Sequence, residues 1–224
     1  MKHSKKNFCY RGALVRLIGT DMSQNSLIHA LVRPAVRALA AHTGLTPNHL
    51  TTLRLATGLA AAMIFAQGID GWVSIIGGLI FLLSMLLDRA DGELARHTNQ
   101  MSVAGHRYDL VSDCIVGIST FIGIGIGVEH TVGLNALWLG AIAGLGIGVL
   151  FLELNLMNLA SVRGHDLFGG RIRVDPDDAM IVVPLLVWCD LAAPMLIAAA
   201  VVAPLTALGM GAIGLLRRTV RCSR

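Results

Sequence analysis

Long apolar runs, separated by short polar connections, follow one another along most of the chain. About 20 residues of α-helix are needed to cross the hydrocarbon core of a bilayer. Six apolar spans lie at about residues 50–67, 72–91, 109–128, 135–157, 179–190 and 194–216. The connections at 68–71 and 129–133 are short, which predicts antiparallel neighbours. The pattern predicts an all-α fold, an integral-membrane bundle of six transmembrane helices.

The segment before the first span, residues 26–42, is too short and too charged to cross a membrane. Its apolar residues recur at every fourth position, beside two arginines: Leu27, Leu31, Ala35 and Leu39, with Arg33 and Arg37. This spacing predicts an N-terminal amphipathic helix in the cytoplasmic interface, or alternatively a soluble helix packed on the bundle. We expect a cytoplasmic N-terminal segment at 1–45, a six-helix domain at 46–218 and a basic cytoplasmic tail at 219–224.

Composition and charge agree with a membrane protein. The 224 residues are 54% hydrophobic and 14% charged, with a mean hydropathy of +0.68, whereas soluble domains carry about 25% charged residues. Apart from Arg54, in the first turns of the first span, the Lys and Arg residues lie before that span, around the second and fourth connections, and in the tail. The positive-inside rule then places both termini and all basic segments on the cytoplasmic side of the cell (inner) membrane. The net charge of +4 reflects topology, with anionic lipid or phosphate binding as a second use, and no nucleic-acid partner is expected.

Acidic residues interrupt the second and third spans near their cytoplasmic ends. On one helix Asp88 and Asp91 share a face, and on the other Asp109 and Asp113 lie one turn apart. If the chain turns near 99–100, Asp91 lies level with Asp109 and Asp88 with Asp113. Four carboxylates this close need a cation between them. Oxygen-only ligands favour Mg²⁺ or Mn²⁺, and two such ions are common where a phosphoryl group is transferred.

Small residues and an arginine surround these carboxylates. Gly92, Ala95 and Gly105 leave room for a bulky ligand against the backbone, and Arg96 offers a fork for phosphate. The residues alone therefore predict a metal-dependent site for a phosphate-bearing ligand, opening to the cytoplasm.

Residues 88–113 read D-x2-D-G-x2-A-R-x8-G-x3-D-x3-D, which resembles the signature of the CDP-alcohol phosphotransferase family at all eight fixed positions. The resemblance implies that Asp88, Asp91 and Asp109 bind the metals. It implies that Asp113 is the general base for the acceptor hydroxyl and also a metal ligand. It assigns the CDP moiety to Gly92, Ala95, Arg96 and Gly105. Family members use a divalent cation, attack the β-phosphoryl group of a CDP-linked donor and release CMP, and many are homodimers.

Other candidate residues carry weaker signals. The run T-P-N-H-L-T at 46–51 resembles a segment of many relatives and suggests that Asn48 and Thr51 contact the nucleotide; capping and contacts to neighbouring helices are the alternative. Candidate acceptor-binding residues are Arg107, Arg163, Arg171, Arg173 and Glu153, although topology and interhelical hydrogen bonding explain them equally well. Glycines at helical spacing (Gly123, Gly127, Gly140, Gly144 and Gly148) pack either the bundle or a dimer interface.

These signals predict a membrane transferase in phospholipid biosynthesis. We expect it to move a phosphatidyl group from CDP-diacylglycerol to a small polyol or polyol phosphate, with release of CMP. The wording DGELAR at 91–96 also resembles relatives that use the soluble donor CDP-inositol to make di-inositol phosphate. An ion transporter with intramembrane carboxylates is the competing class, but it gives no reason for the spacing of the glycines and of Arg96.

Overall fold

The computed structural model describes residues 36, 45–156, 166–167, 172–173 and 180–222. The helices are α3 (Pro47–Gln67), α4 (Gly71–His97), α5 (Val103–Gly127), α6 (Glu129–Val132), α7 (Ala136–Leu156), α8 (Val182–Trp188) and α9 (Ala192–Cys222). Two antiparallel strands of two residues each, β1 (Asp166–Leu167) and β2 (Ile172–Arg173), stand apart from this helical pattern. The predicted all-α bundle is confirmed, with this small strand pair as its one addition among the described residues.

Five of these helices, α3, α4, α5, α7 and α9, are long and apolar enough to cross a membrane. The chain is therefore a multi-pass membrane protein. The predicted count of six is not confirmed, because the apolar run at 179–190 forms α8, whose seven residues rise only about 10 Å. α8 packs against α4, and Trp188 Nε1 donates a hydrogen bond to the Ser74 carbonyl at 3.0 Å.

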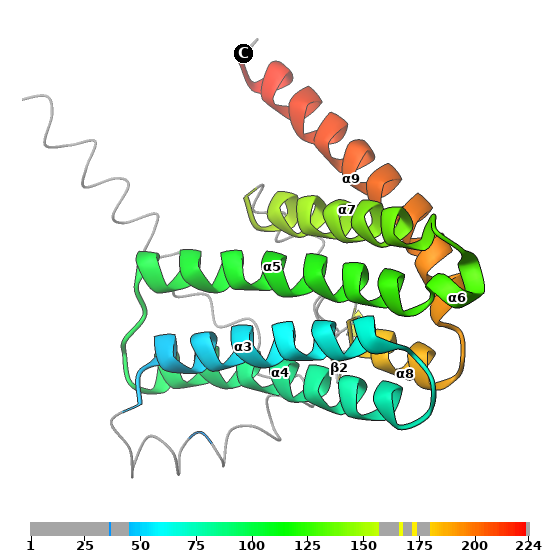
Figure 1. Ribbon diagram of the computed structural model, residues 1–224. Coiled ribbons are helices and arrows are strands. Elements are labelled where there is room, and N and C mark those ends of the chain that lie inside the picture. The colour runs from blue at the N-terminus through cyan, green and yellow to red at the C-terminus, as the bar shows by residue number, and fades with distance from the viewer. Residues whose placement is uncertain (1–35, 37–44, 157–165, 168–171, 174–179, 223–224) are drawn as a thin grey trace, which may run out of the picture.

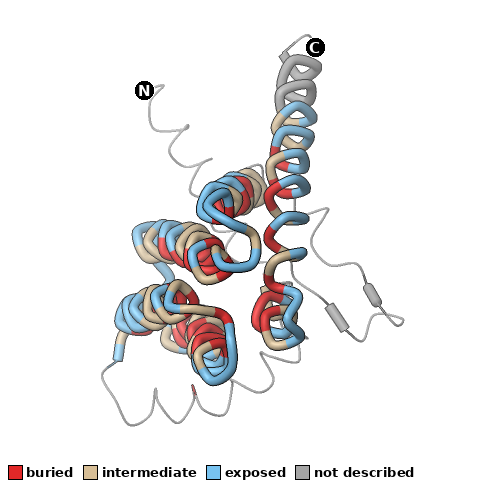
Figure 2. The backbone as a smooth tube through the Cα atoms, turned by 45° about the vertical axis from the view of Figure 1, so that its right-hand side comes forward, coloured by how far each residue is buried: buried red, intermediate tan, exposed pale blue. Residues whose placement is uncertain are grey.

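α3, α4, α5 and α7 lie side by side with successive helices antiparallel, whereas α9 is inclined to them and, like α7, leads away from the end that holds α6 (Figure 1). α3 packs against both α4 and α5, α5 packs against α7, and α7 packs against α9. α4 and α5 have few direct contacts with each other, although only residues 98–102 connect them. Figure 2 shows buried residues on the faces that the helices turn toward one another. α3 thus packs between α4 and α5, which are the second and third predicted spans.

Glycines bring the helix backbones together at the end of the bundle that holds α6. A Cβ atom at Gly123 would collide with the Ala62 carbonyl oxygen, and one at Gly127 would collide with that of Phe65, both on α3. A Cβ at Gly140 of α7 would lie 2.5 Å from the Phe121 carbonyl oxygen of α5. Gly144 and Gly148 likewise face Ile118 of α5. The glycine stripes therefore pack the bundle itself, which is one of the two alternatives that their spacing allows.

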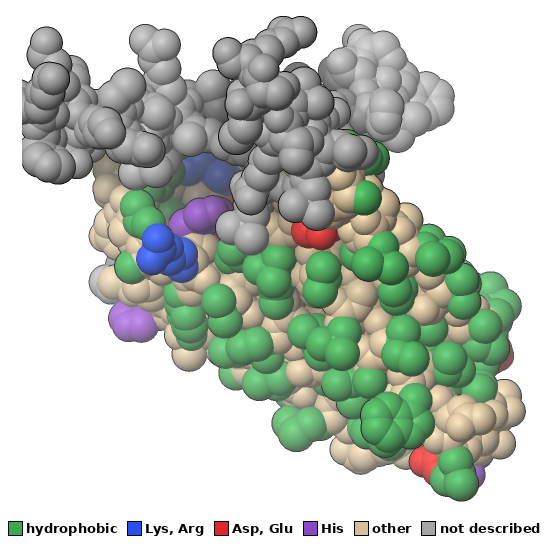
Figure 3. Space-filling model, turned by 90° about the horizontal axis from the view of Figure 1, so that it is seen from above, with side chains coloured by type: hydrophobic (Ala, Val, Ile, Leu, Met, Phe, Trp, Pro, Cys, Tyr) green, Lys and Arg blue, Asp and Glu red, His purple; other side chains and the backbone are tan. Residues whose placement is uncertain are grey.

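Apolar side chains cover the middle of the outer surface. On the face seen in Figure 3, charged and histidine side chains lie toward the two ends of the bundle and hydrophobic ones lie between them. Large exposed side chains include Leu79 on α4 and Leu205 on α9, at 55% and 63% exposure. This is the surface expected of helices whose outer faces contact lipid rather than water.

The helix starts at the opposite end agree with their sequence signals. α3 begins at Pro47, after Thr46, whose backbone N–H donates to His49 Nδ1 at 3.3 Å. α5 begins after Ser102, whose hydroxyl accepts from the Gly105 N–H at 2.9 Å. Both are regular N-terminal caps.

Of the predicted interfacial helix at 26–42, the structure describes Val36 alone. Val36 is helical, 2% exposed, and clusters with Leu50 of α3 and Leu94 of α4. The other residues of that segment lie outside the described part of the chain. The division into 1–45, 46–218 and 219–224 stays a prediction.

Candidate active site

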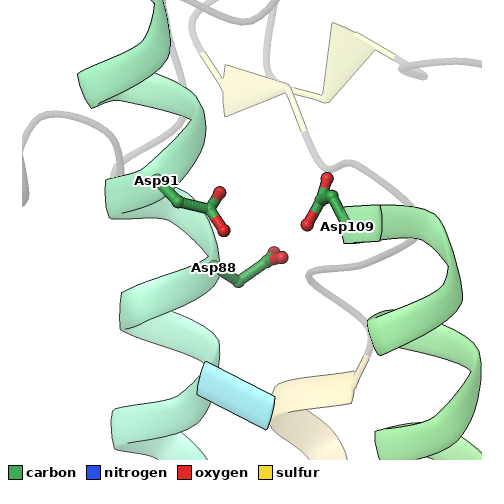
Figure 4. Close-up of side chains that lie close together, drawn as sticks. All are labelled: Asp88, Asp91 and Asp109. Carbon is green, nitrogen blue, oxygen red and sulfur yellow. The ribbon is translucent and has the colours of Figure 1, made fainter. Parts of the chain in front are cut away.

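Three carboxylates from two helices meet in one half of the bundle. Asp88 and Asp91 come from α4 and Asp109 comes from α5, and one carboxylate oxygen of each lies within 4.8 Å of the other two. Figure 4 shows these side chains directed into the space between the two helices. Asp91 is 4% exposed, and the other two are half-buried. The predicted convergence of acidic groups from the second and third spans is therefore observed for these three residues.

The fourth predicted carboxylate, Asp113, lies one turn further along α5 and pairs with an arginine of α3. Arg54 Nη1 contacts Asp113 Oδ1 and lies 4.0 Å from Asp109 Oδ1. Arg54 Nε lies 3.2 Å from Asp88 Oδ1. When all four carboxylates are ionised, Arg54 offsets one of four negative charges. The site then keeps an excess of three and attracts cations.

α3 forms a third side of the site. The sequence places Asn48 and Thr51 of this helix beside the nucleotide, but it does not predict that the helix reaches the carboxylates. Thr51 Oγ1 donates to Asp91 Oδ2 at 2.7 Å, and Thr51 itself is 3% exposed. One turn later, Arg54 reaches the other carboxylates, and its carbonyl oxygen accepts a hydrogen bond from Ser84 Oγ of α4 at 2.9 Å. The site is therefore a gap between α4 and α5 that α3 closes, rather than a tightly packed helical hairpin.

The donor atoms fit a hard divalent cation. The grouped side chains of Asp88, Asp91 and Asp109 offer carboxylate oxygens, and neither histidine nor cysteine belongs to this group. Mg²⁺ and Mn²⁺ prefer such ligands, whereas Zn²⁺ sites usually include His or Cys. The chemistry of the site therefore agrees with the predicted metal class.

The residues expected to hold the nucleotide lie around the carboxylates. Arg96 has a 45% exposed side chain and pairs with Glu93 at 2.9 Å. A Cβ at Gly92 would lie 3.7 Å from Arg96 Nη1, and Ala95 is half-buried on the same helix. Gly105 faces Asn48 across α3 and α5, because a Cβ there would lie 3.3 Å from Asn48 Oδ1. Thr51 bonds to Asp91 of the neighbouring helix α4. A contact between helices was the alternative to nucleotide binding for Thr51.

The acceptor-binding candidates are spread out. Arg107 is exposed near the start of α5, and Glu153 lies on α7, where its Oε1 would be 2.8 Å from a Cβ at Gly211 of α9. Arg163 and Arg171 lie outside the described residues, and Arg173 is described only as part of β2. Of these five, only Arg107 and Glu153 have described side chains, and neither is among the described residues that contact the carboxylates.

A cavity of about 140 Å³ extends from the Arg54–Asp113 pair between α4, α5 and α7. Asp88 also lines its polar side. Its apolar walls include Phe81, Met85, Val116, Ile147, Phe151 and Leu154. A cavity of this size lined by apolar side chains suits a short hydrocarbon segment, because engineered cavities of about 150 Å³ bind benzene.

Arg54 is the residue of the site that sequence reasoning missed. The sequence pattern marks Arg54 only as one basic residue in the first turns of the first span. An arginine within an apolar helix is costly and usually marks a functional contact. Its position three residues after Thr51, on the same helix face, was a second available signal.

The comparisons with known proteins agree with the site. Residues 44–206 match the model of the CDP-alcohol phosphatidyltransferase family. This match spans well over half of the chain, so the chain belongs to the CDP-alcohol phosphatidyltransferase family. The family suggested by the carboxylate spacing is confirmed.

Curated relatives match in part. The chain is 32% identical to cholinephosphotransferase 1 of Danio rerio over 96 residues, which are 38% of this chain and 25% of the relative. It is 35% identical to archaetidylinositol phosphate synthase of Pyrococcus horikoshii over 88 residues, 39% of this chain and 44% of the relative. The matches thus span less than half the length of either relative.

Two solved structures share the fold. Phosphatidylinositol phosphate synthase (PgsA1) of Mycobacterium tuberculosis with CDP-DAG bound aligns with a TM-score of 0.59 at 18% identity, over 82% of this chain and 91% of that one. The same enzyme in complex with manganese and citrate aligns with a TM-score of 0.59 at 20% identity, over 80% and 88%. At this level of identity the likeness shows a common fold.

Proposed function

We propose that this protein transfers a substituted phosphoryl group from a CDP-linked donor to an alcohol and releases CMP, in phospholipid biosynthesis. The observation that carries the proposal is the convergence of Asp88, Asp91 and Asp109 at the family's spacing, with Asp113 one turn away. An ion relay needs carboxylates but gives no reason for this family signature around them.

The residue roles follow from position. Asp88, Asp91, Asp109 and Asp113 would hold two divalent ions, either Mg²⁺ or Mn²⁺. Bound cations of this kind neutralise a diphosphate and stabilise the charge on a departing phosphate. The CDP moiety lies against Gly92, Ala95 and Gly105, with Arg96 as its phosphate fork and Asn48 and Thr51 at the start of α3.

Asp113 is the proposed general base. The acceptor hydroxyl forms a bond to the β-phosphorus of the donor as the bond from that phosphorus to the CMP oxygen breaks. Asp113 takes the hydroxyl proton, and CMP leaves with the bridging oxygen. Positioning of the two substrates supplies much of the acceleration in such transfers.

We propose CDP-diacylglycerol as the donor. The apolar cavity beside Asp88 and Asp113 supports a substrate whose reacting phosphate is joined to hydrocarbon. A fold shared with an enzyme whose structure contains CDP-DAG agrees with this choice. The acceptor is a small polyol or polyol phosphate, with Arg107, Arg163, Arg171, Arg173 and Glu153 as the residues that would contact it. CDP-inositol remains the alternative donor, because the sequence of residues 91–96 resembles that of relatives that use it.

The proposed setting is the inner cell membrane, with both termini and the active site on the cytoplasmic side. The distribution of Lys and Arg supports this orientation. A homodimer is proposed because many members of the family are homodimers.

The test is CMP release by the purified protein. CDP-diacylglycerol and CDP-inositol are offered separately, each with a panel of polyols and polyol phosphates, with Mg²⁺ or with a chelator. The proposal predicts metal-dependent CMP release that one acceptor stimulates with the lipid donor. Stimulation only with CDP-inositol would reverse the donor assignment. Ion flux in proteoliposomes without CMP release would replace the enzyme with a transporter.

A further inference from the structure

Arg54 is the group at the site to which the proposed reaction assigns no role. It is 8% exposed, lies in the membrane-spanning helix α3, and approaches Asp88, Asp109 and Asp113 together. A buried guanidinium is costly to desolvate unless it is well paired. Its carbonyl oxygen is also bonded by Ser84, so both the backbone and the side chain of this residue are held at the gap between α4 and α5.

The contacts of α3 divide the four carboxylates unequally. Asp88, Asp91 and Asp109 offer the three oxygens that lie within 4.8 Å of one another. Asp91 takes its hydrogen bond from the neutral Thr51, whereas Asp113 contacts the cationic Arg54. Arg54 therefore lies closest to Asp88 and Asp113, between the ion-binding trio and the proposed base.

We infer that Arg54 is a positioning residue, a built-in counterion that orients Asp113 and weakens the affinity of the cluster for divalent ions. The orienting part rests on the proposed function, because it assigns Asp113 as the base. The electrostatic part concerns the carboxylates themselves and can be measured without any substrate.

Two effects of opposite sign follow when Arg54 is removed. The cluster loses a positive charge that repels an incoming cation, so ion affinity rises. Asp113 loses the partner that fixes its direction, so the rate of proton transfer falls. A purely structural arginine predicts a different result, because loosened packing would weaken ion binding and turnover together.

The experiment measures Mn²⁺ affinity of the full chain in detergent, by the electron paramagnetic resonance signal of free Mn²⁺, without donor or acceptor. The variants are Arg54→Met, Arg54→Lys, Asp113→Asn and the double variant. Asp70→Asn is the control, because it removes a charge at the opposite end of α4 from the carboxylates. On the same samples, kcat and KM are measured with CDP-diacylglycerol.

We expect Arg54→Met to bind Mn²⁺ roughly tenfold more tightly, with kcat reduced about 100-fold and KM for the donor little changed. Arg54→Lys keeps the charge, so it should retain the wild-type Mn²⁺ affinity and recover part of kcat. Asp70→Asn should resemble the wild type in both Mn²⁺ affinity and kcat. Equal or weaker Mn²⁺ binding by Arg54→Met overturns the inference.

The double variant protects the test if Arg54→Met does not fold. Arg54→Met with Asp113→Asn removes one charge of each sign, so the cluster keeps its excess of three negative charges and Mn²⁺ affinity stays near that of the wild type. Asp113→Asn alone leaves an excess of two negative charges, so this variant should bind Mn²⁺ roughly tenfold more weakly than the wild type. Equal weakness in the single and double variants shows that Arg54 does not act on the cluster. A wild type that binds Mn²⁺ but releases no CMP contradicts the proposed function instead.

Discussion

α3 and α5 pack in opposite ways at their two ends. At one end, Gly123 and Gly127 bring α5 against the backbone of α3 at Ala62 and Phe65. At the other end, the charged side chains of Arg54 and Asp113 lie between the same two helices. The first arrangement uses close backbone packing, which is a main source of stability between helices in lipid. The second pairs opposite charges, but it also holds the carboxylates of Asp88, Asp91 and Asp109 close together, and these like charges repel one another. We call the end with Gly123 and Gly127 the tight end, and the end with Arg54 and Asp113 the polar end. The tight end thus holds α3 and α5 in the register that keeps the polar end together.

Asp113→Asn removes the proposed base at the polar end and has the largest expected effect. Asparagine keeps the shape of the side chain but cannot take the acceptor proton, so kcat should fall about 10²–10⁴-fold. CMP release measures the loss, and binding of a CDP ligand should remain. Asp70→Asn, at the opposite end of α4, is the control and should leave kcat unchanged. Near-normal turnover of Asp113→Asn would remove the base assignment.

Gly123→Leu breaks the tight end. Its side chain would push against the α3 backbone at Ala62, which we expect to cost about 3 kcal/mol of unfolding free energy. Thermal unfolding in detergent measures this loss. Gly209→Ala on α9 is the control, because a Cβ there meets nothing within 4 Å. A stability of Gly123→Leu equal to that of Gly209→Ala would contradict the close packing.

Thr51→Val sharpens the comparison at the polar end. It removes the 2.7 Å hydrogen bond that orients Asp91. Loss of a hydrogen bond to a metal ligand typically weakens metal affinity about 10-fold or more, and a Mn²⁺ titration measures this change. Thr206→Val, whose hydroxyl bonds only to carbonyls of α9, should keep wild-type affinity. If both variants bind Mn²⁺ alike, Thr51 has no role in orienting the ligand.

Ser84→Ala has the smallest expected effect. It removes the hydrogen bond to the Arg54 carbonyl, and such a bond contributes about 1 kcal/mol to stability. Chemical unfolding of the two proteins under identical detergent conditions measures the difference. An unchanged unfolding free energy would show that this contact does not help to hold α3 beside α4.

The sequence predicted most of the bundle because apolar length is a direct consequence of bilayer thickness. The sixth span, predicted at 179–190, is not confirmed, because apolar composition alone does not distinguish a membrane span from a short helix buried in the protein. Val183, Pro184 and Val187 of α8 are buried. A run of only 12 residues, too short for a span, already favoured a buried helix.

The acidic side of the site followed from helix periodicity, because Asp88, Asp91 and Asp109 lie on predictable faces. The role of α3 did not follow, because it depends on which helices pack together. A hairpin of α4 and α5 was the simplest arrangement, whereas the structure places α3 against both. Arg54 enters the site only through that packing, so its charge was explained by topology.

The most direct test of the central claim is an anomalous-scattering map from crystals of this protein soaked in Mn²⁺. The account predicts a peak within ligand distance of Asp88, Asp91 and Asp109, and its disappearance in Asp91→Asn. A map without a peak among these carboxylates, or a peak that Asp91→Asn leaves unchanged, would contradict the account.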